Sequence, residues 1–231
     1  MSGARDQILG AMRRALKRGP DDAAAREAVA QRLDSRPRGP IPARGQLPHQ
    51  DQVALFEDMA VEAAATVVRV GSRDDVPGAV ADYLKAHNLP PRLRAAPDPA
   101  IEGLPWERQP LLEVTTGRAE ADDQVSVTHA VAGVAETGTL VLASGARAPT
   151  TLNFLPDTNI VVLEAAQVVG AYEDAWDRLR AVHGDGVLPR TVNLITGPSR
   201  SADIEQTIQL GAHGPRRLHI VLVEDDAGDG R

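Results

Sequence analysis

The sequence predicts an α/β protein built on a mainly parallel sheet that is covered on both faces. From Thr66 onward, short runs rich in Val, Leu and Ile alternate with segments whose apolar residues recur at helical spacing. Strands joined by helices run parallel and are buried on both sides. Aromatic residues make up only 3% of the 231 residues, so the core must be aliphatic. This length suits one domain with an appendage.

The first 48 residues differ in character from the rest of the chain. Residues 5–17 place Ile8, Leu9, Met12 and Leu16 on one helical face with basic residues around it, and a second short helix is expected over 21–33. Residues 35–48 then hold four prolines, two glycines and three arginines, as a linker does. We therefore expect a helical segment with a linker over residues 1–48 and an α/β domain over 49–231. The segment is expected to pack on its own domain or on another subunit, and the alternative is that its basic helix lies on a membrane surface or on acidic partners.

The expected elements of the domain follow the alternation of patterns along the chain. Residues 97–110 are rich in proline and indicate a surface excursion. Helices are expected from about residue 50 and over 74–87 and 171–183, and strands over 66–70, 92–96, 111–115, 124–128, 139–143, 159–163, 191–196 and 218–223.

A first candidate motif, GVAETGT, precedes the apolar strand at 139–143. Its small residues allow a close approach of backbone or ligand. Glu136 interrupts this apolar stretch, either as the outward residue of a loop or as a buried carboxylate with a functional role. Thr137, Gly138 and Thr139 complete the candidate binding residues here. Arg147, in the loop after the strand, is either solvated or a clamp for a carboxylate or phosphate.

The second candidate motif is the stretch NLITGPSRSADIEQTIQLGAHGP, residues 193–215. It predicts a strand, a turn at Gly197-Pro198, and a helix that Ser199 or Ser201 caps and Gly211 ends. Unpaired N–H groups at the start of such a helix attract anions, and the guanidinium of Arg200 adds donors suited to an oxyanion. The alternative is an ordinary capped connection in which acidic residues of the first turn, Asp203 among them, satisfy the helix end. His213 is interpreted as a turn residue or a hydrogen-bonding group near the same pocket.

The two motifs are expected to face each other across one pocket. Ligand crevices of open α/β sheets lie beyond the carboxyl ends of strands, and both motifs adjoin predicted strands. The predicted ligand is a small carboxylate or a phosphate-containing molecule.

Composition excludes several classes of function. A formal net charge of −7 argues against a nucleic-acid partner. Without cysteine the chain forms no disulfide and holds no iron-sulfur cluster by its own thiolates. The six histidines are scattered, so no metal site is expected. No apolar run reaches the roughly 20 residues of a membrane span, and the N-terminus lacks the apolar core of a secretion signal, so a cytoplasmic protein is expected. The usual NAD, P-loop, esterase and zincin motifs are missing.

Three stretches resemble a known family closely: GVAETGTLVL, the pattern LP-D-x-x-I-V-V-L, and GPSRSADIEQTIQLGAHGPRRLHIVLV. They are similar to the lactate-utilisation protein C (LutC/YkgG) family, whose defining module is the LUD domain, over roughly residues 50–223. The resemblance implies a Rossmann-like sheet of the type found in ribose-5-phosphate isomerase, glucosamine-6-phosphate deaminase (NagB/RpiA) and CoA transferases.

The same resemblance implies a role in oxidising L-lactate to pyruvate beside two partner proteins that carry iron-sulfur clusters. Its motif positions include those named above, without a firm catalytic assignment, and its cofactor is unknown. By analogy of fold, Glu136 would match a CoA-transferase nucleophile. Two alternatives stay open: a free-standing enzyme of the sugar-phosphate isomerase or CoA-transferase type, and a non-catalytic scaffold subunit.

Overall fold

The computed structural model describes residues 2–17, 22–184, 186–201 and 209–224. The chain divides into two compact units, Met1–Pro40 and Ile41–Arg231. The first contains α1 (Ser2–Ala15) and α2 (Ala23–Ser35). The α2 helix begins with a cap in which the Asp22 carboxylate accepts the Ala25 N–H at 3.0 Å. Neither helix encloses a core, since Ile8, Met12 and Leu33 are all more than half exposed.

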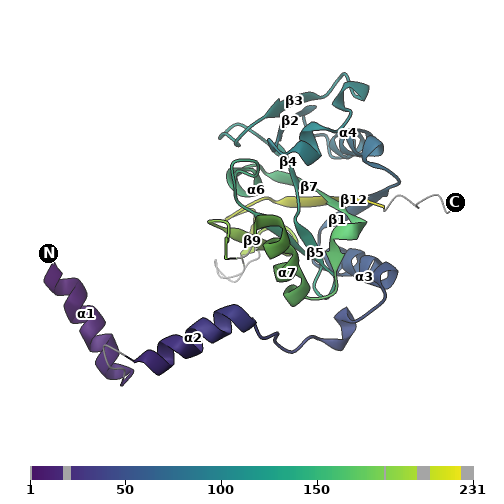
Figure 1. The fold of residues 1–231 in the computed structure, drawn as a ribbon. Helices are drawn as coiled ribbons and strands as arrows, with labels where there is room; N and C mark the ends of the chain where they lie inside the picture. The colour runs from purple at the N-terminus through teal and green to yellow at the C-terminus, as the bar shows by residue number, and fades with distance from the viewer. Residues whose placement is uncertain (1, 18–21, 185, 202–208, 225–231) are drawn as a thin grey trace. The chain divides into compact units, whose positions relative to one another are not determined.

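The second unit alternates helices and strands from residue 49 onward (Figure 1). Its longer helices are α3 (His49–Glu62), α4 (Val76–Ala86) and α7 (Tyr172–His183), with the single turns α5 (Pro99–Glu102) and α6 (Thr151–Phe154). Its described strands are β1 (Thr66–Val70), β2 (Arg92–Ala95), β3 (Glu113–Thr116), β4 (Val125–His129), β5 (Ala132–Val134), β6 (Thr139–Ala143), β7 (Thr158–Glu164), β8 (Val168–Val169), β9 (Val192–Ile195), β10 (Arg200–Ser201), β11 (Gln209–Leu210) and β12 (Arg217–Val223).

The main sheet has six strands in the order β1-β12-β7-β4-β2-β3, and every pair in it is parallel. The central strand β7 reads TNIVVLE, and all but its last residue is buried, as a strand covered on both faces requires. The predicted α/β class with a mainly parallel sheet is therefore confirmed. The finer assignment to the NagB/RpiA and CoA-transferase type stays a prediction.

The two faces of this sheet are covered differently. On one face α4 buries Val76, Val80 and Leu84 against residues such as Ile160 and Val221. On the other face α3 packs together with a second sheet of order β8-β5-β6-β9, in which β6 runs antiparallel to both of its neighbours. Helix α7 then covers the outer side of this second sheet. The sequence predicted helices on both faces, whereas this face is covered by α3 together with a second sheet, to which the small-residue segment before residue 139 contributes β5.

The helix predicted to start at Ser199 or Ser201 and to end at Gly211 is wrong at its C-terminal end, and a start at Ser199 is wrong as well. Arg200–Ser201 pairs antiparallel with Gln209–Leu210 as β10 and β11. The Ser199 N–H donates to the Pro215 carbonyl at 2.9 Å, and the Gly211 N–H donates to the Ser199 carbonyl at 2.9 Å. The Ser199 and Gly211 N–H groups therefore have backbone partners and are not free to bind an anion. Residues 202–208, Asp203 included, lie outside the described residues.

Candidate functional site

A cavity of about 320 Å³ lies where the second motif meets the main sheet, and we call it the Pro198 pocket. Its lining combines the motif turn, the ends of α6 and β9, and the first residues of β7 and β12: Asn153, Phe154, Asn159, Leu194, Ile195, Thr196, Gly197, Pro198, Ser199, Arg200, His213, Gly214, Pro215 and Leu218. The pocket thus follows the carboxyl end of β9 but lies over the amino ends of β7 and β12. The expected position beyond the carboxyl ends of the strands holds only for β9.

Two glycines with positive φ place both motifs against the end of α3. Gly138 has φ +63°, and a Cβ added there would lie 2.3 Å from the Ala60 nitrogen. Gly197 has φ +68°, and its added Cβ would lie 2.0 Å from the Ala63 carbonyl oxygen. A residue with a side chain would be strained and would clash at either position. Both glycines therefore act by allowing backbone to touch backbone.

A chain of four hydroxyl groups joins the first motif to the pocket. Thr139 Oγ1 lies 2.7 Å from Thr137 Oγ1, 2.9 Å from Tyr172 Oη and 2.7 Å from Thr196 Oγ1. Thr137 Oγ1 and Tyr172 Oη are also 3.0 Å apart. Thr139 is fully buried, and Thr196 lines the pocket. The two motifs meet through these hydroxyls, although Glu136, Thr137, Gly138 and Thr139 do not themselves line the cavity.

Glu136 is buried, with 4% of its surface exposed, and it lies at the start of α7. One of its carboxylate oxygens, Oε1, accepts the Tyr172 N–H at 3.3 Å, and its own N–H donates to the Gly170 carbonyl at 3.2 Å. The first residue of α7 thus gains an acceptor that the cap residue Ala171 cannot supply. Of the two interpretations of Glu136, an outward loop residue or a buried carboxylate, the structure shows the buried carboxylate. Its geometry is that of a helix cap, and the negative charge lies at the positive end of the helix dipole.

An amide group without a full set of partners adjoins the pocket. Asn159 is completely buried, and its Oδ1 lies 3.2 Å from Thr128 Oγ1 and 3.3 Å from Ser126 Oγ. Its Nδ2 has no hydrogen-bond partner. A buried amide N–H without an acceptor costs about 1–3 kcal/mol. Asn159 lines the Pro198 pocket, but its Nδ2 is itself buried, so a ligand oxygen reaches this donor only if the pocket wall shifts. Sequence reasoning missed Asn159, which appeared only as the first residue of a predicted strand.

Of the remaining candidate residues, some line the Pro198 pocket and Arg147 does not. Ser199 and Arg200 line the pocket, and one guanidinium nitrogen of Arg200, Nη2, donates to the Ala63 carbonyl at 3.0 Å. His213 is an exposed lining residue in the turn after β11. Arg147 lies in the exposed turn after β6 and lines neither cavity described here. Across the described residues, no group of three or more acidic, His or Cys side chains is placed to hold a metal ion, and no helix is long and apolar enough to cross a bilayer.

Comparison with known proteins agrees with the motifs. Residues 53–223 match the LUD domain family. The chain belongs to this family. Two relatives named lactate utilization protein C confirm the resemblance seen in the sequence: one from Bacillus velezensis is 34% identical over 126 residues, 54% of this chain and 52% of that protein, and one from Bacillus subtilis is 37% identical over 102 residues, 44% and 42% of the two chains. The chain spans about half the length of the curated relatives it matches.

A solved structure shares the fold of this LUD domain. The crystal structure of a DUF162 family protein from Deinococcus radiodurans superposes with a TM-score of 0.56 at 24% identity, covering 77% of this chain and 99% of that one. At this level of identity the likeness shows the fold alone.

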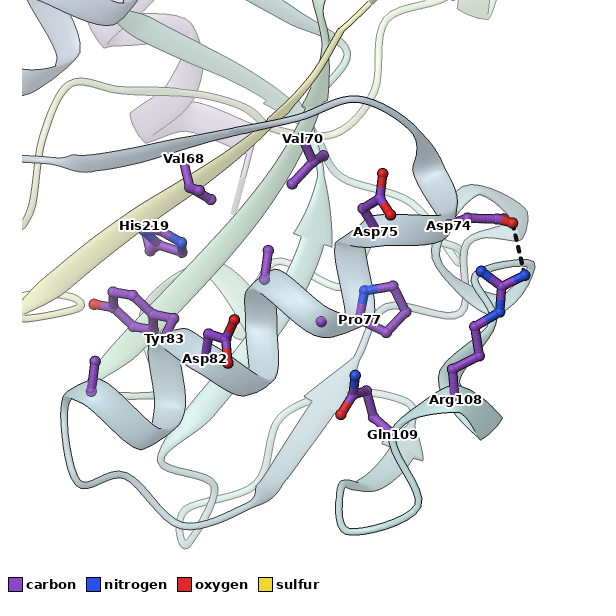
Figure 2. A pocket seen from close by; sticks show the side chains of 13 residues that line it. Val68, Val70, Asp74, Asp75, Pro77, Asp82, Tyr83, Arg108, Gln109 and His219 are labelled. Carbon is purple, nitrogen blue, oxygen red and sulfur yellow. Dashed lines mark hydrogen bonds and ion pairs between the residues drawn. The ribbon is translucent and has the colours of Figure 1, made fainter.

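The LUD domain has a larger cavity, of about 680 Å³, beside α4 (Figure 2). Adjacent residues of a strand point to opposite faces, so Leu218 at the Pro198 pocket and His219 at this cavity place the two on opposite faces of the main sheet. Its floor is apolar, and Asp74 on its rim pairs with Arg108 at 2.9 Å. The Tyr83 ring stacks on the His219 ring, with centroids 3.9 Å apart. Neither candidate motif contributes to this cavity, and no sequence pattern indicated it.

Histidine 219 is held neutral by its surroundings. Burial lowers its pKa to about 4, an effect that the contact with Thr66 opposes and His87 reinforces. Its Nδ1 lies 2.8 Å from Thr66 Oγ1, and its Nε2 has no partner. The ring therefore packs as an uncharged aromatic group at neutral pH.

The carboxyl ends of β4 and β7 carry a cluster of charged side chains. Glu164 accepts hydrogen bonds from Arg73 Nη1 and, in a capping box, exchanges bonds with Gln167. Burial lowers the pKa of nearby His129, against the opposing charge of Glu164. Arg73 also donates to the Ala100 carbonyl, which ties the loop after β1 to α5. Neither cavity described above includes these residues, and the Arg73 contacts join the loop after β1 to the end of β7 and to α5.

Proposed function

We propose that this LUD domain is a component of the system that oxidises L-lactate to pyruvate and that it binds a small 2-hydroxy or 2-oxo carboxylate in the Pro198 pocket. The observation that carries the proposal is the pocket itself, where the Gly197-Pro198-Ser199 turn, the Arg200 side chain and the end of a hydroxyl chain meet. Relatives named lactate utilization protein C support a role in lactate utilisation.

The dimensions and chemistry of the pocket favour a small anion. Its volume of about 320 Å³ is near the lower end of the range for ligand sites, about 300–1,000 Å³. Arg200 supplies a positive charge at the rim. A carboxylate oxygen accepts charge-assisted hydrogen bonds from a guanidinium. Leu194, Ile195 and Phe154 offer apolar surface for a short carbon chain.

Electron transfer would fall to partner proteins. A chain without cysteine cannot hold an iron-sulfur cluster by thiolates. We propose that cytoplasmic iron-sulfur proteins of the lactate-utilisation system accept the electrons, and that this chain binds the organic acid beside them.

The CoA-transferase reading depends on Glu136 as a nucleophile. Such a carboxylate must reach a substrate carbonyl, whereas Glu136 lies outside the Pro198 pocket with an oxygen engaged by the Tyr172 N–H. We therefore propose that Glu136 is a capping residue, which favours the lactate-utilisation role.

Titration of the purified chain with L-lactate, pyruvate, phosphate and sulfate, followed by NMR or calorimetry, tests the binding proposal. Arg200→Ala should weaken acid binding severalfold, because it removes a charge-assisted contact worth on the order of 1.5–3 kcal/mol. Arg147→Ala is the matched control, since it removes an exposed arginine that lines no cavity described here. Absence of binding by either organic acid, or equal losses in the two variants, would contradict the proposal.

The partner proposal needs a separate experiment. Copurification from native cells should recover iron-containing proteins with this chain, and the complex should reduce an electron acceptor when L-lactate is added. A chain that is recovered without iron-containing partners would argue for a free-standing protein.

A further inference from the structure

The hydroxyl chain between the first motif and the Pro198 pocket fixes the direction of one proton, that of Thr196. Its four oxygens belong to Thr137, Thr139, Tyr172 and Thr196, and four contacts of 2.7–3.0 Å join them. Each distance lies in the range of an O–H···O hydrogen bond. Three of the contacts close a triangle of Thr137, Thr139 and Tyr172, and the fourth connects Thr196 to Thr139.

The number of protons determines the donor in the fourth contact. Each hydroxyl has one proton, so four hydrogen bonds require all four hydroxyls to donate once within the chain. The three protons of the triangle can serve at most three of the four bonds. Thr196 must therefore donate to Thr139, whichever way the triangle circulates. Thr139 then accepts two bonds and donates one, which is the full capacity of a hydroxyl oxygen.

The direction of the Thr196 proton determines which ligand groups this residue can bind. Thr196 lines the Pro198 pocket, and its only proton is turned away from the cavity toward the buried Thr139. It thus presents only lone pairs to the pocket, while Arg200 presents N–H donors. A ligand that matches this pattern carries an oxyanion at one end and an O–H or N–H donor next to it.

We propose that Thr196 is the residue by which the pocket prefers a 2-hydroxy acid to the corresponding 2-oxo acid, with Thr137 and Tyr172 as positioning residues that hold its proton away. The inference rests on the proposed binding of a small carboxylate in this pocket. The hydroxyl of a 2-hydroxy acid can donate to Thr196 Oγ1. A keto oxygen in the same place would put two acceptors against each other.

Substitutions of residues that do not line the pocket provide the sharpest test. Without the Thr137 hydroxyl, as in Thr137→Val, only two bonds remain for three protons, so Thr139 can donate to Thr196 and the Thr196 proton is free to enter the pocket. Tyr172→Phe likewise leaves two hydrogen bonds for three protons. Thr137→Ser keeps the hydroxyl and is the matched control for Thr137→Val.

The affinities of L-lactate and pyruvate, which differ only at the 2-position, are to be measured by calorimetry for each variant. The wild-type protein and Thr137→Ser should bind L-lactate roughly three- to tenfold more tightly than pyruvate, the range expected for one neutral hydrogen bond. In Thr137→Val and Tyr172→Phe the ratio should approach one through tighter pyruvate binding. A wild-type preference for pyruvate, or a ratio that both variants leave unchanged, would overturn the inference.

Neutron diffraction from deuterated crystals of the wild-type protein decides the proton direction independently of any ligand or variant. The Thr196 deuterium should lie on the line to Thr139 Oγ1, and a deuterium aimed into the cavity would refute the assignment. If neither acid binds, the proposed function fails, and the neutron map still decides whether Thr196 presents an acceptor.

Discussion

Gly138 and Gly197 rest on the same end of α3, although 59 positions separate them in the chain (197 − 138 = 59). The added Cβ of Gly138 would meet the backbone of Ala60, and that of Gly197 the carbonyl of Ala63. Helix α3 therefore sets the separation of the two motifs and, with it, the contact between Thr139 and Thr196.

Alanine at either glycine should destabilise the fold strongly. Both positions have positive φ and no room for a Cβ, so backbone strain of about 1 kcal/mol adds to a clash that costs about 1–3 kcal/mol. We expect the free energy of unfolding to fall by about 2–4 kcal/mol for Gly138→Ala and for Gly197→Ala in urea titrations. Gly145→Ala is the control, because nothing lies within 4 Å of its added Cβ and its φ is ordinary. Equal stability of the three variants would contradict this account.

The sequence predicted those parts of the fold that depend on local pattern. Strands β1 and β6 lie at the predicted residues 66–70 and 139–143, because runs of β-branched and aliphatic residues bounded by turns leave few alternatives. A helix start at Ser199 and a helix end at Gly211 were predicted wrongly, because the serines and acidic residues of this segment also fit a helix cap. Pairing of Arg200–Ser201 with Gln209–Leu210 is a contact that local propensity does not record.

The candidate site was predictable only in part, because contacts between segments distant in the chain form much of it. The motifs pointed to the Gly197-Pro198 turn and to the threonines around Gly138, because glycine next to polar residues is typical of sites where backbone or ligand approaches closely. Asn159 and Tyr172 gave no signal, because their importance arises from strands and helices that meet only in the folded chain. Asn159 matters because β7 brings it under the turn, and Tyr172 because α7 places its hydroxyl beside Thr137 and Thr139.

Removing the Glu136 carboxylate should affect stability rather than chemistry. Glu136→Ala deprives the Tyr172 N–H of its acceptor, and loss of a capping side chain costs about 0.5–2 kcal/mol. Glu136→Gln keeps an acceptor oxygen and should recover at least half of that loss. Thermal unfolding measures both variants, and binding of L-lactate should differ from wild type by less than twofold. A variant as stable as wild type that no longer binds or turns over substrate would show that the carboxylate acts on the ligand.

The segment before α3 should be needed for full stability, which refines the predicted boundary at residue 48. Gly45 is buried against Gly170, where an added Cβ would lie 2.6 Å from the Gly170 carbonyl oxygen, and its own carbonyl accepts a bond from Gln52 Nε2 at 3.0 Å. A chain that starts at Ile41 keeps these contacts, and one that starts at His49 loses them. We expect the longer form to unfold at the wild-type temperature and the shorter form several degrees lower, as about 1 kcal/mol of lost packing produces. Identical melting curves would place the boundary at residue 48.

The fold should lose stability as the pH falls from about 6.5 to about 4, in part because of His219. Its pKa is lowered by burial from 6.5 to about 4, so in this interval the unfolded chain binds a proton that the native protein does not. Stability therefore rises with pH across the interval and is fully present above about 6.5. The shift corresponds to about 3 kcal/mol at most.

Replacing His219 by a residue that does not titrate isolates its contribution to the pH dependence of stability. His219→Gln keeps a polar group near Thr66 Oγ1 but cannot be protonated, so its unfolding free energy should change less between pH 6.5 and 4 than that of the wild type. His213→Gln is the control, because His213 is exposed and lies in a turn at the other cavity. Urea titrations at half-unit pH steps give the two slopes. Carboxylates contribute equally to all three proteins. Parallel wild-type and His219→Gln curves would therefore mean that His219 is protonated in the native state, so that burial does not keep it neutral.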